Sequence, residues 1–95
     1  MRHAARIDAN QSDIVAAMRA QGASVYLIKL PVDLLVGYGG KTALVEVKNP
    51  NSRYGRAGLN TNQQDWLASW KGGPAAIVDS VDAAQRLLAL MGHWQ

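Results

Sequence analysis

Two apolar segments on either side of a glycine turn constrain this chain more than any other feature. Residues 31–37 read Pro-Val-Asp-Leu-Leu-Val-Gly, and residues 44–48 read Leu-Val-Glu-Val-Lys, with Gly39 and Gly40 between them. Segments rich in Leu and Val around such a turn are typical of a β-hairpin. If the turn is centred between Gly39 and Gly40, the numbers of paired residues sum to 79. Asp33 then lies opposite Glu46.

Two carboxylates that face each other across strands are costly unless something positive lies between them. At an effective dielectric constant near 20, carboxylates about 5 Å apart repel by roughly 3 kcal/mol. A divalent cation would offset this repulsion. Because side chains alternate along a strand, Lys48 shares the face of Glu46, whereas Val45 and Val47 point to the other face. Two carboxylates and one ammonium on one patch predict, in outline, a site that cleaves phosphodiesters.

Composition narrows the class of protein. Ninety-five residues, 48% of them hydrophobic, predict one globular domain over residues 1–95. There is no cysteine, which excludes disulfides and thiolate metal sites, and the two histidines, His3 and His93, lie near opposite ends of the chain. No apolar run reaches the roughly 20 residues that a membrane span needs, and the first residues lack a signal-peptide core. We therefore expect a cytoplasmic protein with no membrane contact.

The charge balance favours a polyanionic partner. Ten Lys and Arg against seven Asp and Glu give a net charge of +3. Arg53, Tyr54 and Arg56 lie in a loop rich in Gly, Asn and Pro. They are interpreted either as contacts to phosphates and bases or as a solvated loop. Lys41, a further basic residue, is also predicted to bind nucleic acid. Glu46 is the only glutamate in the chain, so solvation alone is a poor explanation for it.

The pattern of apolar and turn residues predicts seven elements in the order α-β-β-β-α-β-α. A first helix is expected from about Ala9 to Gly22, with Asp8 as N-cap and Gln11 in a capping box. Strands are expected over 23–30, 33–36, 43–48 and 75–78. Further helices are expected from Asn60 or Thr61 to about residue 71, and from Asp79 or Ser80 to Gly92. The third and fourth strands should be parallel, because a crossover helix joins them.

This order, with an acidic residue on the second strand and Glu-x-Lys on the third, resembles the PD-(D/E)xK nuclease superfamily. The chain is most similar to the small stand-alone VRR-NUC-type nucleases of phages and bacteria. The stretches that carry the resemblance are 8–11, 19–23, 31–37, 46–48, 59–66, 70–72 and 78–83. The resemblance implies a restriction-endonuclease-like α/β core, a four-stranded mixed sheet flanked by helices, and the cytoplasm of a bacterial or phage-infected host cell.

The same resemblance implies roles for individual residues. Asp33 and Glu46 match the carboxylates that bind Mg²⁺ or Mn²⁺, and the backbone carbonyl of Val47 matches a further ligand. Lys48 matches the residue that positions or activates the attacking water. Oxygen ligands suit these cations, which polarise the phosphate and acidify water. A surface hairpin with an incidental Glu46–Lys48 arrangement is the structural alternative.

Two glutamines leave alternatives open. Gln63 matches a glutamine early in the second helix and shares the face of Trp66 and Trp70, or it is an exposed residue at the helix start. Gln11 stands where many relatives carry a glutamate, so it is either a metal ligand without charge or only a helix cap. The departure at Gln11 favours one strong metal site over two. A second departure is Pro-Val-Asp where the family has Pro-Asp.

The expected function is hydrolysis of DNA phosphodiesters by a metal-dependent endonuclease. Similarity to Holliday-junction resolvases implies a homodimer that cleaves branched DNA. The alternative is a nucleic-acid-binding accessory protein that keeps the fold with weak or no activity. Metal dependence separates the two, because a binding module should bind DNA equally well in a chelator.

Overall fold

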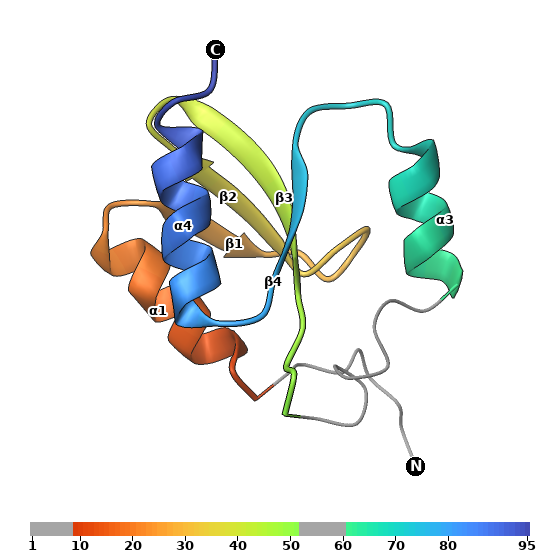
Figure 1. Cartoon of the computed structure of the whole chain (residues 1–95), viewed down its shortest axis with the longest axis horizontal. Helices are drawn as coiled ribbons and strands as arrows, with labels where there is room; N and C mark the ends of the chain where they lie inside the picture. The colour runs from red at the N-terminus through yellow and green to blue at the C-terminus, as the bar shows by residue number, and fades with distance from the viewer. Residues whose placement is uncertain (1–8, 52–60) are drawn as a thin grey trace.

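The computed structural model describes residues 9–51 and 61–95. A four-stranded sheet in the order β1-β2-β3-β4 forms its centre (Figure 1). The first three strands are antiparallel, and β4 lies parallel to β3. The predicted α/β class with a mixed sheet is therefore confirmed. In chain order the elements are α1 (Gln11–Ala20), β1 (Ser24–Leu27), β2 (Leu34–Tyr38), β3 (Lys41–Val47), α3 (Thr61–Ser69), β4 (Ala75–Val78) and α4 (Val81–Met91).

The β2–β3 hairpin has the predicted register. Leu34 pairs with Val45, and the other pairs follow the same sum of 79 down to Tyr38 with Lys41. Gly39 and Gly40, the two residues of the turn, have φ angles of 59° and 77°. A two-residue hairpin turn with both φ angles positive matches the twist of the strands, and glycine adopts it without steric penalty. Asp33 directly precedes Leu34 and Glu46 directly follows Val45, so the two carboxylates lie at the same end of the hairpin.

Helices α1 and α4 lie side by side on one face of the sheet (Figure 1). Strand side chains of one parity point toward them and form the core with apolar residues of both helices. A Schellman motif ends α1: Gly22, at φ 98°, donates to the Arg19 carbonyl, and Ala23 donates to the Met18 carbonyl. The largest fully buried side chains are Ile14, Met18, Leu34, Leu88, Met91, Val36, Val45 and Val47.

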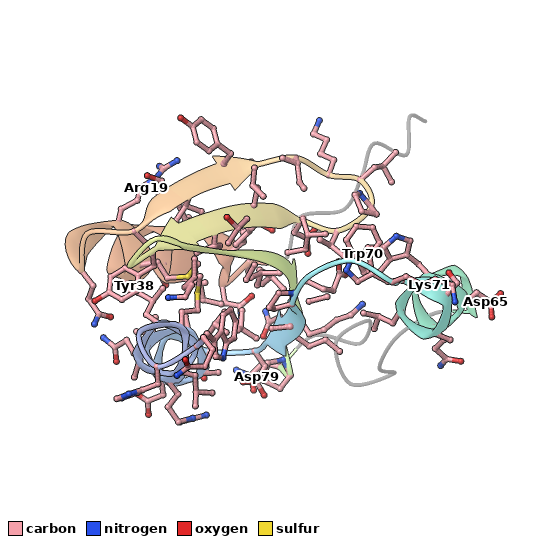
Figure 2. The ribbon with its side chains drawn as sticks, turned by 90° about the horizontal axis from the view of Figure 1, so that it is seen from above. Arg19, Tyr38, Asp65, Trp70, Lys71 and Asp79 are labelled. Carbon is pink, nitrogen blue, oxygen red and sulfur yellow. The ribbon has the colours of Figure 1, made fainter. Side chains whose placement is uncertain are left out.

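The other face of the sheet is more open. Tyr26, Leu35 and Leu44 lie across it in register, and Tyr26 is 65% exposed. Helix α3 stands on this side, apart from α1 and α4 (Figure 1; Figure 2, seen from above). Glu46 and Lys48 belong to the open face, because Val45 and Val47 are buried on the helix-covered side.

The structure corrects several predicted boundaries: β2 and β3 each extend two residues farther toward the turn than expected, and α3 ends at Ser69. Helix α1 begins at Gln11, with Asn10 as N-cap and no side-chain cap hydrogen bond, so Gln11 is not the third residue of a capping box. Strand β1 ends at Leu27 instead of continuing to residue 30, since Lys29 has a φ of 71°, which no extended strand allows. Of the two predicted caps of α4, Asp79 and Ser80, the structure selects Ser80, and its hydroxyl accepts from the Ala83 N–H at 3.0 Å.

Leu27 and Trp70, two large apolar residues within the predicted strands and helices, are exposed. Leu27 is 52% exposed because it stands at the end of an edge strand. Trp70 is 41% exposed because it follows a helix that stands away from the sheet. No helix within residues 9–51 and 61–95 is long and apolar enough to cross a membrane.

Candidate functional site

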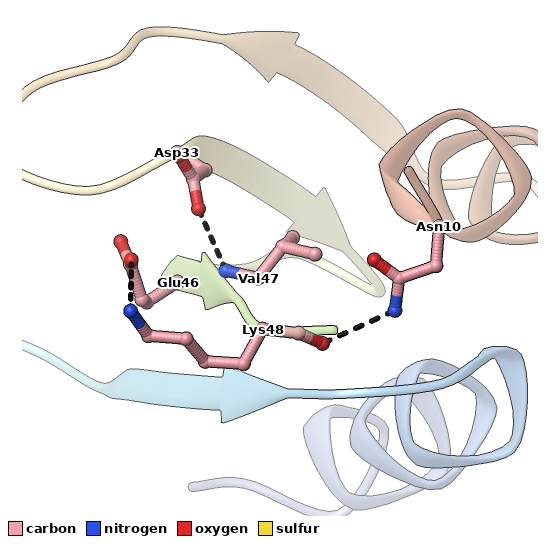
Figure 3. Close-up of polar contacts among 5 residues, drawn as sticks. All are labelled: Asn10, Asp33, Glu46, Val47 and Lys48. Carbon is pink, nitrogen blue, oxygen red and sulfur yellow. Dashed lines mark hydrogen bonds and ion pairs between the residues drawn. The ribbon is translucent and has the colours of Figure 1, made fainter. Parts of the chain in front are cut away.

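Asp33, Glu46 and Lys48 come together where β2 begins and β3 ends (Figure 3). The Asp33 Oδ2 atom accepts a hydrogen bond of 2.8 Å from the backbone N–H of Val47. The Lys48 Nζ atom lies 3.6 Å from Glu46 Oε2. The hairpin register and the alternation of β3 therefore place two carboxylates and one ammonium together, as the sequence predicts.

Backbone pairing fixes this end of β3 on both sides. The Lys48 N–H donates to the Val78 carbonyl at 2.9 Å, which continues the parallel pairing with β4. Val47 points its N–H the opposite way, toward Asp33. Because the N–H and C=O of one residue in a strand lie on the same edge, the Val47 carbonyl also faces the Asp33 side. A backbone oxygen thus lies on the same side of β3 as Asp33.

Burial makes the Glu46 carboxyl an unusually weak acid. Its exposed fraction is 6%. Burial raises the pKa of the Glu46 carboxyl to about 7, and the neighbouring Asp33 carboxylate adds to this rise, while Lys48 opposes it. The single ammonium therefore does not balance both carboxylates. A site of this kind accommodates one further positive charge.

Asn10 ties the start of α1 to this end of the sheet, a role the sequence analysis did not identify. Its Nδ2 group donates to the Lys48 carbonyl at 3.1 Å and to the Asp79 carbonyl at 3.0 Å. The two carbonyls follow β3 and β4, so one amide joins three elements. Figure 3 shows its bond to the Lys48 carbonyl. An Asn before a helix usually indicates only a cap, and no local signal distinguishes a contact with residues 38 and 69 positions away.

Removing this tie is expected to destabilise the fold. Asn10→Ala should lower the free energy of unfolding by about 1–3 kcal/mol, because two carbonyls lose a donor. Asn10→Asp should lose a similar amount, since a carboxylate cannot donate, although Asp is a good N-cap. Urea unfolding of both variants measures the effect. Wild-type stability in Asn10→Asp would show that helix capping is the role of this residue.

Gln11 is buried beside this tie. It is the first residue of α1 and is 4% exposed, and its Oε1 atom has no hydrogen-bond partner among the described residues. Leaving a buried acceptor without a partner costs about 1–3 kcal/mol. A cation within reach of that oxygen would give it a partner. Gln11 therefore remains a candidate metal ligand.

The structure does not bring Lys41 to the cluster. Lys41 begins β3 beside the hairpin turn, at the opposite end of the strand from Glu46. Arg53, Tyr54 and Arg56 lie outside the described residues. Gln63 belongs to α3, and its side chain also lies outside the described part.

Among residues 9–51 and 61–95, no three His, Cys, Asp or Glu side chains gather into a group that could hold a metal ion. The cluster contains two carboxylates, and any further ligands would be the Gln11 amide and backbone oxygens. Comparisons of the chain with family models, with curated proteins and with solved structures find no match. The function is therefore inferred from the geometry of the cluster.

Proposed function

We propose that this chain is a divalent-cation-dependent endonuclease of the PD-(D/E)xK type that hydrolyses DNA phosphodiesters. The observation that supports the proposal most strongly is the joint placement of Asp33, Glu46 and Lys48. Two acidic groups and a lysine come together on one face of the sheet at the end of a hairpin, with Lys48 Nζ 3.6 Å from Glu46 Oε2. The mixed sheet flanked by helices is compatible with a restriction-endonuclease-like core.

The residues present fit Mg²⁺ or Mn²⁺. Both cations prefer oxygen ligands, and each usually keeps several waters. Asp33 and Glu46 would supply charged oxygens, Val47 a backbone carbonyl and Gln11 its unpartnered amide oxygen. A cation would also offset the burial and the repulsion from Asp33 that together raise the pKa of Glu46. A bound divalent cation would supply polarisation of the phosphate and a more acidic water.

The protein's own groups then have distinct tasks. In hydrolysis, a water oxygen attacks phosphorus, the bond to one ester oxygen breaks, and a phosphate monoester and a hydroxyl remain. Asp33 is held in place by the Val47 N–H. Lys48 is held in place by its ion pair with Glu46 and by the backbone bond to Val78. Its ammonium can orient the attacking water and offset the charge that develops on the phosphate oxygens.

We further propose a homodimer that prefers branched DNA. A chain of 95 residues presents little surface for gripping a duplex, and two copies would supply two active sites for two strands. The resemblance to Holliday-junction resolvases supports this arrangement. The net charge of +3 is consistent with a polyanionic substrate.

The test is cleavage of linear, nicked, flapped and four-way-junction DNA in Mg²⁺, in Mn²⁺ and in chelator. The proposal predicts cleavage that requires a divalent cation and is fastest on the junction. Equal cleavage of every substrate would keep the nuclease and reject the branch preference. DNA binding in chelator without cleavage in either metal would favour the non-catalytic accessory protein.

A further inference from the structure

Trp66, in the last turn of α3, and Trp70, which directly follows α3, form a stacked pair. The ring centroids of Trp66 and Trp70 are 5.1 Å apart, and the ring planes are inclined by 25°. Such offset stacking is a favourable arrangement for aromatic rings. Residues one turn apart on a helix are neighbours, so the pair follows directly from the i, i+4 spacing.

The loop after α3 holds Trp70 in one orientation. Its indole Nε1–H donates to the Gly73 carbonyl at 2.7 Å. A Cβ atom added at Gly72 would collide with the six-membered part of the Trp70 ring, so only glycine allows this approach. The ring is thus fixed by Trp66, Gly72 and Gly73. The hydrogen bond also occupies the only polar atom of the indole, so its remaining exposed surface is purely aromatic.

This fixed ring is nevertheless 41% exposed. The residues that follow it up to β4, Lys71, Gly72, Gly73 and Pro74, are all exposed, and none has a large apolar side chain. A stacked tryptophan pair followed by small, polar and cationic residues does not resemble a broad apolar protein interface. It matches the combination of a stacking surface with a neighbouring positive charge that binds single-stranded nucleic acid.

Trp70 also lies on the same side of the sheet as the proposed active site. Helix α3 stands on the side away from α1 and α4, and Figure 2 shows Trp70 and Lys71 there, with Asp65 farther from the sheet. Glu46 and Lys48 point to that same side of the sheet. A strand bound at the cluster would therefore have Trp70 on its side of the molecule.

We infer that the Trp66–Trp70 pair is a platform on which an unpaired base of the substrate stacks, with Lys71 contacting its phosphate. This inference rests on the proposed function and specifies its substrate class: DNA with a single-stranded nucleotide near the scissile bond. A blunt duplex offers no free base for Trp70, whereas a flap or an open junction does.

The test measures DNA binding in chelator, so it does not require cleavage. Fluorescence anisotropy is recorded with a labelled oligothymidylate of roughly ten nucleotides and with a blunt duplex. The wild type should bind the single strand more tightly than the duplex. Trp70→Leu should weaken single-strand binding by roughly 10-fold, within the range expected for one lost base stack. Trp70→Tyr keeps a ring and should retain most of the affinity.

Leu90→Ala is the matched control, because Leu90 is an exposed apolar residue on α4, and its binding should equal that of the wild type. Circular dichroism melting checks that the Trp70 variants fold. Equal binding of Trp70→Leu and wild type would overturn the inference. The inference would also be overturned if the wild type were a dimer, Trp70→Leu were a monomer, and the variant lost single-strand and duplex binding equally. Trp70 would then contact a second copy of the chain. If the wild type binds the single strand through Trp70 but does not cleave DNA in Mg²⁺ or Mn²⁺, the proposed nuclease activity is rejected and the stacking role of Trp70 is kept.

Discussion

Glu46→Gln is expected to reduce divalent-dependent DNA cleavage by roughly 100- to 1,000-fold. Glutamine keeps the size of the side chain but removes its charge, so a cation and the Lys48 ammonium both lose their partner. The same change should make the metal-free protein more stable above pH 7, since it removes a buried carboxylate whose pKa is raised to about 7. Lower activity combined with higher stability is the signature of a residue kept for function.

The control for this prediction is Asp82→Asn, an exposed carboxylate in the first turn of α4. It should cleave DNA at the wild-type rate. Initial rates on the preferred substrate and urea unfolding in chelator give the two readouts. If Glu46→Gln cleaved normally, or if it were less stable than the wild type above pH 7, the assignment of Glu46 would be wrong.

The second large effect is a fall in the stability of the metal-free protein as the pH rises. The folded-state pKa of Glu46 is about 7, above its ordinary value of 4.5. The folded protein therefore holds more protons than the unfolded chain between these values, and stability decreases with pH across that window. The contribution of the Glu46 carboxyl to the free energy of unfolding is fully present below pH 4.5 and is lost as the pH rises through 7. A shift of this size corresponds to on the order of 3 kcal/mol.

Urea unfolding at several pH values, after metal has been removed, measures this dependence. Because other groups also titrate, the informative quantity is the difference in unfolding free energy between wild type and Glu46→Gln. The difference should grow in favour of the variant between pH 4.5 and 7 and then level off. A difference that does not change with pH would contradict the burial of a charged Glu46.

The hairpin and its register could be predicted from the sequence because their determinants are local. Gly39 and Gly40 select a two-residue turn, and the turn then sets every pair up to Leu34 with Val45. The contact of Glu46 with Lys48 follows from strand alternation alone. The hydrogen bond from the Val47 N–H to Asp33 lies one residue beyond the expected partner, Glu46. It could not be predicted from the sequence, because it depends on the path of the backbone just before β2.

Features that depend on distant packing could not be predicted in this way. Asn10 resembles a helix cap in the sequence, but its amide bonds to carbonyls after β3 and β4. Trp70 has the spacing of a buried helix face, yet α3 stands off the sheet and leaves the ring exposed. Lys41 adds to the positive charge of the chain, but it lies at the opposite end of β3 from Glu46, and net charge does not indicate where a charge is placed. Periodicity shows which residues share a face, and only the packing of elements shows what covers that face.

The most direct test of the account is a calorimetric titration of Mn²⁺ into wild type, Asp33→Asn and Glu46→Gln above pH 7. The account predicts saturable binding to the wild type, which weakens at least about 10-fold in each variant, as expected when a carboxylate ligand is lost. Asp82→Asn should bind as the wild type does. Undiminished binding in both Asp33→Asn and Glu46→Gln would contradict the claim that the opposed carboxylates hold a divalent cation.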